Sequence, residues 1–347
     1  MSSIAKMILC FVKMKNLTQP THVFFTLTFK PFKMKHLLKS IFYFSFLLMN
    51  IFGNQQLSAQ INAVTSLYCK SIVIPNITYL TIDSTDLQLD AYIPAKNLGG
   101  NPWVEFTEDR KPVLLYIHGG GWTDLNRTIR NLNIMPYIDK GFAVVNIDYR
   151  LLYQAPFPAC IADCRYALNW IYENASQYKF DTTRIVVSGE SAGGHLALMT
   201  GFLTDDREIF IPEKPITRKL KVAAVINWFG VTDMEKIADF WNSDDFVRNL
   251  TGDTLTKAYI YKTCSPLTYV NPAVPPVLTI HGDRDESVPF IHAQVLHDAL
   301  NENQVKNKLI VIEGKRHGDF DENEMNQSFD AIWKFLKESG NMSDNPQ

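Results

Sequence analysis

From about residue 77 onward, short runs rich in Val, Ile and Leu alternate with stretches in which apolar residues recur every three or four positions. Continuous apolar runs are typical of strands buried on both faces, and the second spacing is typical of helices. The alternation predicts an α/β protein with a mainly parallel, eight-stranded sheet flanked by helices. The predicted strands are Ile77–Ile82, Leu87–Ile93, Val113–His118, Ala143–Tyr149, Arg184–Ser188, Ala223–Phe229, Val277–His281 and Lys308–Ile312. The predicted helices are Asn126–Asp139, Phe157–Tyr178, Ser191–Leu203, Pro289–Asn301 and Glu324–Glu338.

Two parts of the chain depart from this alternation. Only a few residues around Ser84 separate the first two predicted strands, which predicts an antiparallel hairpin at one edge of the sheet. Residues 232–269 combine aromatic residues such as Phe240, Trp241 and Tyr259 with many polar ones. This segment is interpreted either as a small lid-like cap insertion over a pocket or as a peripheral helical excursion with its own packed aromatics.

The first 59 residues differ in charge from the rest of the chain. They contain seven lysines but no arginine, aspartate or glutamate. The remainder holds 27 of the 34 basic residues and all 36 acidic ones, a net charge of −9. Because phosphate binding needs a basic face, this acidic body argues against nucleic acid as a partner.

Residues 34–59 have the pattern of a cleavable secretory signal peptide. Lys35 and Lys39 precede a nearly unbroken apolar run, Ile41–Phe52, and small residues lead up to Ala59. A bilayer-spanning helix needs about 20 apolar residues, so this shorter run argues against a stable membrane anchor. We expect cleavage after Ala59, a secreted or periplasmic protein, and a single folded domain over residues 60–347.

A pentapeptide in the middle of the chain predicts a nucleophile. Gly189-Glu190-Ser191-Ala192-Gly193 fits the G-x-S-x-G pattern and lies between a predicted strand and a predicted helix. The serine of such a motif occupies a tight turn, where neighbouring glycines remove Cβ atoms that would collide. The turn exposes the Ser191 hydroxyl and leaves the Ala192 N–H at a helix N-terminus, which favours an anion. A glycine-rich turn with an incidental serine is the plainer alternative.

A second glycine-rich segment predicts an anion pocket. His118-Gly119-Gly120-Gly121-Trp122 follows an apolar strand, and its glycines allow backbone N–H groups to point into a site. Preorganised donors aimed at the oxyanion of an acyl-transfer transition state each contribute about 3 kcal/mol. We predict that the N–H groups of Gly120, Gly121 and Ala192 form this oxyanion hole, with Gly119 as the alternative donor. A phosphate-binding loop is disfavoured, because the residues that follow its glycines in a P-loop are missing here.

The predicted nucleophile needs a base, and the base needs an orienting carboxylate. In the G-x-S-x-G hydrolases these follow the serine in the order acid, then histidine. The downstream histidines are His195, His281, His292, His297 and His317. His195 lies one helical turn beyond Ser191 and points along the helix. His317 lies in a glycine-flanked loop after the last predicted strand, which can fold back over Ser191, so we predict His317 as general base and later general acid.

The orienting carboxylate is expected in the loop after the strand Val277–His281. Asp283, Asp285 and Glu286 compete for this role. Val288-Pro289 begins the next helix, which places Asp285 deeper in the turn and makes it the preferred acid. Asp283 is the second candidate, and a solvated acidic loop is the plain alternative for all three.

With these residues identified, the sequence resembles the hormone-sensitive-lipase-like and feruloyl/acetyl-esterase-like carboxylesterases of the α/β-hydrolase fold, over roughly residues 75–338. The motifs that carry the resemblance are His118-Gly119-Gly120-Gly121-Trp122, Asp148-Tyr149-Arg150-Leu151, Phe157-Pro158-Ala159 with Asp163 and Trp170, Gly189 to Ala197, His281 to Asp285 with Val288-Pro289, and His317-Gly318. The resemblance implies ester hydrolysis by Ser191, Asp285 and His317. It favours Asp285 over Asp283 and implies neither a metal nor an organic cofactor.

Departures from the family pattern narrow the expectation. Leu152-Tyr153-Gln154-Ala155-Pro156 interrupts the Ala-Pro-Glu continuation of members with a long cap, and little chain precedes the first strand. We therefore expect an open site for short acyl or aryl esters, with acetyl or feruloyl groups on polysaccharide among the candidates. The alternatives are an arylformamidase or peptidase with the same triad, and a non-catalytic hydrolase-fold binding protein.

Four cysteines follow the expected cleavage site, namely Cys69, Cys160, Cys164 and Cys264. Cys160 and Cys164 are four residues apart on a predicted helix and therefore share a face. No His or Cys partners stand at metal-ligand spacing, so the pair is expected to be buried as small apolar side chains.

Overall fold

The computed structural model describes residues 71–96, 105–106, 109–129, 131–203, 216, 218–242 and 256–342. The chain divides into two units, Met1–Ser58 and Ala59–Gln347, and the fold described below belongs to the second. The predicted leader, Cys69 and residues 243–255 of the predicted insertion lie outside the described residues. None of the described helices is both long enough and apolar enough to span a membrane.

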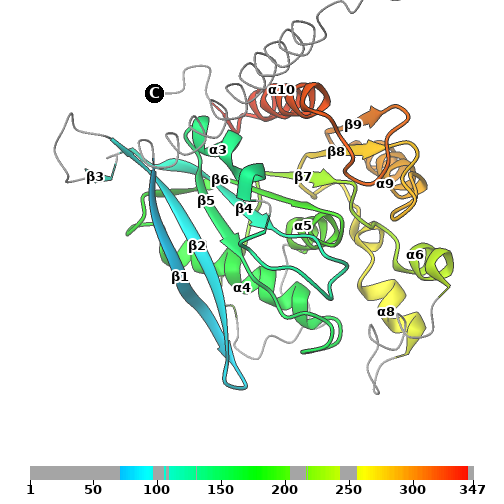
Figure 1. Cartoon of the computed structure of the whole chain (residues 1–347), viewed down its shortest axis with the longest axis horizontal. Helices are drawn as coiled ribbons and strands as arrows, with labels where there is room; N and C mark the ends of the chain where they lie inside the picture. Colours follow the sequence, from blue (N-terminus) through cyan, green and yellow to red (C-terminus); the bar gives the residue numbers. More distant parts are fainter. Residues whose placement is uncertain are drawn as a thin grey trace, which may run out of the picture. The chain divides into compact units, whose positions relative to one another are not determined.

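One nine-stranded sheet organises the described residues (Figure 1). Its strands are β1 (Ser71–Ile82), β2 (Thr85–Lys96), β3 (Glu105–Phe106), β4 (Lys111–Ile117), β5 (Ala143–Ile147), β6 (Phe180–Glu190), β7 (Ala224–Trp228), β8 (Val277–Gly282) and β9 (Asn307–Ile312). Their order is β1-β2-β5-β4-β6-β7-β8-β9, with β3 paired to β2. From β5 to β9 the pairs are parallel. All eight predicted strands are present, and the two-residue β3 was not predicted.

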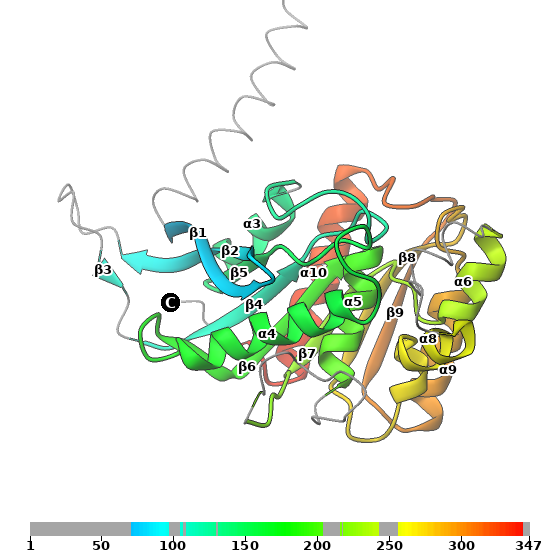
Figure 2. The ribbon, with the colours of Figure 1, turned by 90° about the horizontal axis from the view of Figure 1, so that it is seen from below.

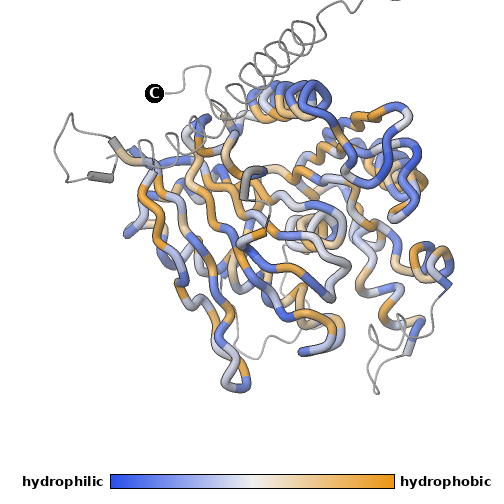
Figure 3. The backbone as a smooth tube through the Cα atoms, viewed as in Figure 1, coloured by the Kyte–Doolittle hydropathy of each residue, from blue (hydrophilic) through white to orange (hydrophobic). Residues whose placement is uncertain are grey.

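The predicted edge hairpin is confirmed. β1 pairs with β2 in antiparallel fashion, and β2 joins the parallel strands through an antiparallel pairing with β5. The connecting residues Asp83 and Ser84 both have positive φ, 46° and 66°. Two successive residues of this kind form the turn whose twist matches that of a two-stranded ribbon. Hydrophobic and hydrophilic residues alternate along this hairpin, which has one face toward the core (Figure 3).

Helices cover both faces of the sheet (Figure 2). They are η1 (Asn131–Ile134), α3 (Met135–Asp139), α4 (Ala159–Glu173), α5 (Ala192–Phe202), α6 (Met234–Trp241), α8 (Lys257–Thr263), η2 (Pro266–Tyr269), α9 (Ile291–Glu302) and α10 (Glu322–Glu338). Residues of α4, α5 and α9 pack in one core layer, and residues of α3 and α10 pack in the other. Every residue of α5 is buried. The end of β6 and the whole of α5 therefore lie within the buried core.

The predicted helix Asn126–Asp139 is wrong in its first part. Residues 126–129 form a turn, and helical structure begins at Asn131. The Asn126 side chain accepts hydrogen bonds from the N–H and the hydroxyl of Thr128. A side chain that bonds to nearby backbone in this way competes with helix formation.

Candidate active site

Ser191 occupies the turn between β6 and α5 with a backbone that is unusual for a residue with a side chain. Its φ is 54° and its ψ is −119°. Glycine is required on both sides, because a Cβ at Gly189 would lie 2.4 Å from the Gly193 oxygen and one at Gly193 would lie 2.1 Å from the Ile117 oxygen. The Ser191 N–H donates to the Trp228 oxygen at 2.9 Å, which fixes the turn to the end of β7.

The glycine loop after β4 passes directly beside this turn. A Cβ at Gly119 would lie 2.9 Å from the Glu190 oxygen and 3.6 Å from the Cβ of Ser191. Gly120 and Gly121 follow with φ of 110° and 60°. The N–H groups of Gly120, Gly121 and Ala192 donate no hydrogen bond to another described residue. The structure thus brings the predicted oxyanion segment next to the predicted nucleophile.

A ring contact and hydrogen bonds of His118 and Tyr149 hold this loop in place. The His118 ring stacks on Tyr149 with centroids 4.3 Å apart, and its Nδ1 lies 2.7 Å from the Gly119 oxygen. The Tyr149 hydroxyl donates to the His118 oxygen at 3.1 Å. Burial lowers the pKa of His118, although the Gly119 contact opposes this. His118 is therefore bonded within its own loop.

His195 supports the same loop from α5. Its Nδ1 accepts the Trp122 Nε1–H at 3.3 Å, so its Nε2 carries the proton and donates to the Cys264 oxygen at 2.7 Å. Burial lowers the pKa of His195 to about 4, and the imidazole is neutral at pH 7. Both nitrogens are thus engaged with groups other than Ser191.

The structure places Asp285 and His317 in direct contact. His317 Nδ1 lies 2.7 Å from Asp285 Oδ2. The other carboxylate oxygen accepts the N–H groups of Ser287 and Val288, both at 2.8 Å. Burial alone would raise the pKa of Asp285, but its bonds with His281 and His317, the charge on His317 and the Val288 N–H together lower it below its ordinary value. Asp285 is therefore ionised at neutral pH.

The competing carboxylates have other partners. Asp283 accepts the Gly314 N–H at 2.6 Å and so links the loops after β8 and β9. Glu286 lies 3.9 Å from Arg316, and both side chains are exposed. Of the three acidic candidates, all of them described, Asp285 is the one in contact with His317.

Phe229 connects the nucleophile with the histidine. It follows Trp228, whose oxygen accepts the Ser191 N–H, and its ring lies 4.6 Å from the His317 ring, centroid to centroid. Ser191 and His317 thus flank one short turn after β7. No hydrogen bond joins the Ser191 hydroxyl to His317 in the described part of the chain. In unliganded enzymes such contacts are often long and shorten when substrate binds.

Sequence reasoning assigned no role in this site to three of the side chains around it. Phe229 had no motif to identify it. His281 lies 3.3 Å from Asp285 Oδ2 and 2.8 Å from the Val288 oxygen, so it is a second histidine on the same carboxylate. Trp241 donates its Nε1–H to the Ser287 oxygen at 2.9 Å, with its ring 6.3 Å from that of Trp122. The aromatic content of residues 232–269 was the available signal for Trp241.

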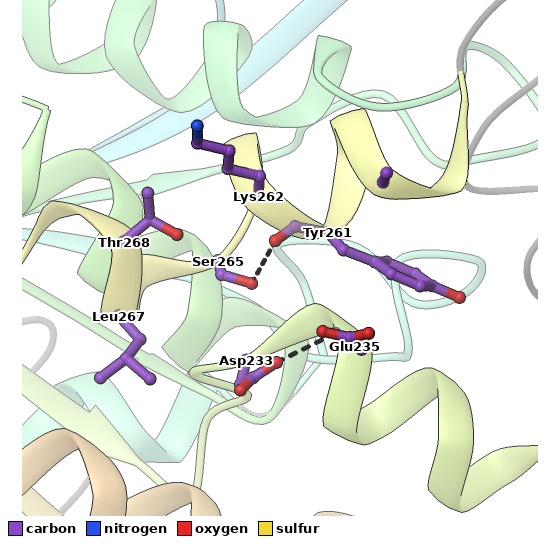
Figure 4. A pocket seen from close by; sticks show the side chains of 8 residues that line it. Asp233, Glu235, Tyr261, Lys262, Ser265, Leu267 and Thr268 are labelled. Carbon is purple, nitrogen blue, oxygen red and sulfur yellow. Dashed lines mark hydrogen bonds between the residues drawn. The ribbon is translucent and has the colours of Figure 1, made fainter.

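The predicted insertion also contains a polar hollow of about 420 Å³ between α6, α8 and η2 (Figure 4). Asp233 accepts the Glu235 N–H at 3.0 Å as the cap of α6, and the Ser265 hydroxyl donates to the Tyr261 oxygen at 2.5 Å. Lys262 also lines the hollow. Neither Ser191, Asp285 nor His317 lines it, so this hollow is separate from the candidate active site.

The described residues include no group of three His, Cys, Asp or Glu side chains that could hold a metal ion. Cys160, Cys164 and Cys264 are buried free thiols, and burial is the main cause that raises the pKa of each. Cys160 and Cys164 therefore pack as small apolar side chains, as predicted.

The parallel sheet, the strand–serine–helix turn and the loops at the carboxyl ends of the strands define an α/β-hydrolase fold. Residues 103–300, more than half of the chain, match the BD-FAE family model, and the chain belongs to this family. Esterase LipC of Mycobacterium tuberculosis is 28% identical over 194 residues, which are 54% of this chain and 48% of LipC. The chain spans about half the length of the curated relatives it matches.

Solved esterase structures share the fold. A truncated carbohydrate esterase from gut microbiota is 27% identical with a TM-score of 0.63, over 78% of this chain and 97% of that one. Thermogutta terrifontis esterase 2, phosphoramylated by tabun, is 25% identical with a TM-score of 0.65, over 80% of this chain and 97% of that one.

Proposed function

We propose that this chain is a secreted serine carboxylesterase that cleaves short acyl or aryl esters through an acyl-enzyme. The contact between Asp285 and His317, beside the strained turn of Ser191, is the observation that carries the proposal. Esterase relatives over half or more of the chain support it.

The proposed mechanism starts from the contact between Asp285 and His317. Asp285 is ionised and accepts a hydrogen bond from His317 Nδ1, so Nε2 is the imidazole nitrogen left to accept a proton. That nitrogen takes the proton of Ser191 as its oxygen attacks the ester carbonyl. The new imidazolium is stabilised by Asp285 and then protonates the departing alcohol. In the second half of the reaction, His317 takes a proton from water as the water oxygen attacks the acyl carbonyl. The proton then passes to Ser191 as the acid leaves.

The negative charge of both tetrahedral intermediates needs donors that are already in place. We assign this role to the N–H groups of Gly120, Gly121 and Ala192, with Gly119 as the alternative in the loop. Their lack of partners among the described residues and the position of Ala192 at the start of α5 support the assignment.

Export and a polysaccharide-linked substrate are part of the same proposal. The signal-peptide pattern of residues 34–59 supports export of a mature chain that begins at Gln60. A structural relative described as a carbohydrate esterase supports a carbohydrate-linked ester.

Residues 232–269 are proposed as a small cap. The support is Trp241, whose ring contacts that of Trp122 and whose Nε1–H donates to the Ser287 oxygen.

Hydrolysis of p-nitrophenyl acetate tests the proposal. Ser191→Ala is expected to lower kcat by at least a factor of about a thousand, because the nucleophile is removed. Ser176→Ala is the matched control, since Ser176 is exposed beyond the end of α4. Undiminished ester turnover by Ser191→Ala would refute the proposal. Cleavage of formanilide or a peptide anilide, with no ester turnover, would assign the triad to an amidase.

A further inference from the structure

A small cavity lies between the residues that adjoin the proposed nucleophile and those that adjoin the proposed base. Its volume is about 70 Å³. Its walls come from the residue before the nucleophile, the turn after β7, the loop after β9 and the start of α10, and they include Glu190, Trp228, Phe229, Gly318, Phe320 and Met325. The sequence analysis assigned no role to this cavity.

The cavity is built from the immediate neighbours of both reacting residues. Glu190 precedes Ser191, and Gly318 follows His317. The Phe229 ring lies 4.6 Å from that of His317 and 5.8 Å from that of Phe320. Ser191 and His317 do not themselves line the cavity, but each is a chain neighbour of a residue that does, so one substituent of an ester bound between them can extend toward it.

The walls are mixed, with three aromatic rings on one hand and the polar pair of Asn133 and Glu190 on the other. Asn133 donates to the Glu190 carboxylate at 3.3 Å and to the Tyr116 hydroxyl at 3.2 Å. Glycine is needed at position 318, where φ is 67° and a Cβ would lie 3.1 Å from Phe229 Cζ. A larger residue at this position would push the Phe229 ring, so the glycine allows Phe229 to keep its place in the cavity wall.

The volume sets the size of group that can enter. About 70 Å³ is roughly half of the 150 Å³ or so that an apolar cavity needs to take up benzene, and about twice the share of one water molecule. An acetyl or propionyl chain is small enough to enter the cavity. The phenyl ring of a feruloyl-type acyl group is too large.

We propose that this cavity is the acyl subsite and that its walls restrict the enzyme to acetyl and propionyl esters. The inference rests on the proposed function and selects the small acyl groups over the feruloyl group. The acyl group stays bound to Ser191 while the alcohol leaves and water enters, so a small confined space suits the acyl group better than the alcohol. A sugar alcohol within a polysaccharide is also far too large for this space.

The test compares kcat/KM for p-nitrophenyl acetate, propionate, butyrate and hexanoate, and for methyl ferulate. The wild-type protein is expected to lose at least about tenfold for each step beyond propionate, because an extra methylene that cannot be accommodated is discriminated by about 10- to 200-fold. Met325→Ala and Phe320→Ala are expected to move the optimum to butyrate or hexanoate. Met342→Ala is the matched control outside the cavity, and it is expected to keep the wild-type profile.

Three results would overturn the inference. The wild-type protein could turn over hexanoate or methyl ferulate as well as acetate. The enlarged variants, with folding checked by thermal unfolding, could keep the wild-type acyl profile. They could instead change the preference among acetates of different alcohols, which would place the leaving group in the cavity. Absence of turnover with every ester would refute the proposed function itself.

Discussion

Ser191 has a φ of 54°, which a residue with a Cβ adopts only at a cost of about 1–3 kcal/mol. The surrounding structure tolerates this cost, because β6 and α5 are both buried and the Ser191 N–H is fixed to Trp228. The orientation of the hydroxyl is thus set by the backbone. The strained backbone thus falls at the half-buried residue that we propose as the nucleophile.

The strain predicts an inverted order of stability between two inactive variants. Ser191→Gly is expected to be more stable than Ser191→Ala by about 1 kcal/mol, because glycine adopts this backbone without a Cβ clash. In ordinary helix or strand positions glycine is the less stable of the two by a similar amount. Urea unfolding of both variants measures the difference. Equal stability, or a more stable alanine variant, would show that the turn is unstrained.

At the residue scale, the sequence was enough to identify residues that belong to a motif. It was not enough to identify residues that contact the motif only in the folded structure. Ser191, Asp285 and His317 were proposed from chain order and local spacing. Phe229 contacts His317 only because β7, β8 and β9 are neighbours in the sheet, and no local pattern encodes that contact. His281 lies four residues before Asp285, but its contact with the carboxylate depends on how the loop after β8 folds back.

At the scale of elements, a buried network ties the segment after the glycine loop to the edge of the sheet. The Arg127 side chain bonds to Asp90, Asp148 and Asn76, and its N–H donates to Asp148 at 2.8 Å. The Asn146 side chain also donates to the Arg127 oxygen at 2.6 Å. This network links β1, β2 and β5 with the chain that follows Gly121. These contacts also hold residues 126–129 in a turn, so helical structure does not begin at Asn126 as predicted.

Arg127→Met is expected to destabilise the protein by about 3 kcal/mol, because it leaves the buried Asp90 and the half-buried Asp148 without their cation. It is also expected to lower kcat for p-nitrophenyl acetate roughly tenfold or more with little change in KM, because the proposed oxyanion donors lose their support. Arg184→Met removes a partly exposed pair with Asp181 and is expected to cost about 1 kcal/mol or less. Chemical unfolding and steady-state kinetics measure both effects. A destabilised Arg127 variant with unchanged kcat would show that the network does not support the proposed oxyanion loop.

The strands were predictable as elements because their apolar runs are continuous, whereas β3 has only two residues and no run to detect. Helix ends were less predictable. α4 ends at Glu173 rather than Tyr178, and the side-chain bonds of Asn174 and Asn126 interrupt helical geometry where apolar spacing continues. Hydrophobic periodicity carries no information about such local competition.

At the scale of the whole molecule, buried neutral histidines make stability depend on pH. Burial lowers the pKa of His195 and of His292 to about 4. In the unfolded chain both have the ordinary value near 6.5, so the unfolded state binds more protons between pH 4 and 6.5. Stability therefore decreases as pH falls through this window. Asp285 acts in the same direction at lower pH, because its pKa lies below the ordinary value.

The free energy of unfolding is expected to fall between pH 6.5 and 4 by up to about 1.4 kcal/mol per pH unit for each of the two histidines. His292→Asn is expected to reduce this slope, because its Oδ1 can accept the Thr232 N–H without titrating. Urea unfolding at several pH values provides the measurement. A slope that is unchanged in the variant would show that His292 is protonated in the folded protein.

The fold as a whole was the most predictable level, because several motifs in one order constrain the topology more than any single element does. The serine turn, the acid loop and the histidine loop follow β6, β8 and β9, which belong to the four neighbouring parallel strands β6-β7-β8-β9. The volume of the cavity beside Ser191 was not predictable, since it depends on how Phe229, Phe320 and Met325 pack.

Covalent labelling tests most directly whether Ser191 is the nucleophile that His317 activates. The protein is incubated with diethyl p-nitrophenyl phosphate, p-nitrophenol release is counted, and the modified peptide is mapped by mass spectrometry. The account predicts one equivalent of p-nitrophenol, a diethylphosphoryl group on Ser191, and labelling that is slowed by orders of magnitude in His317→Ala. A phosphorylated side chain other than Ser191, or equally fast labelling of His317→Ala, would contradict it.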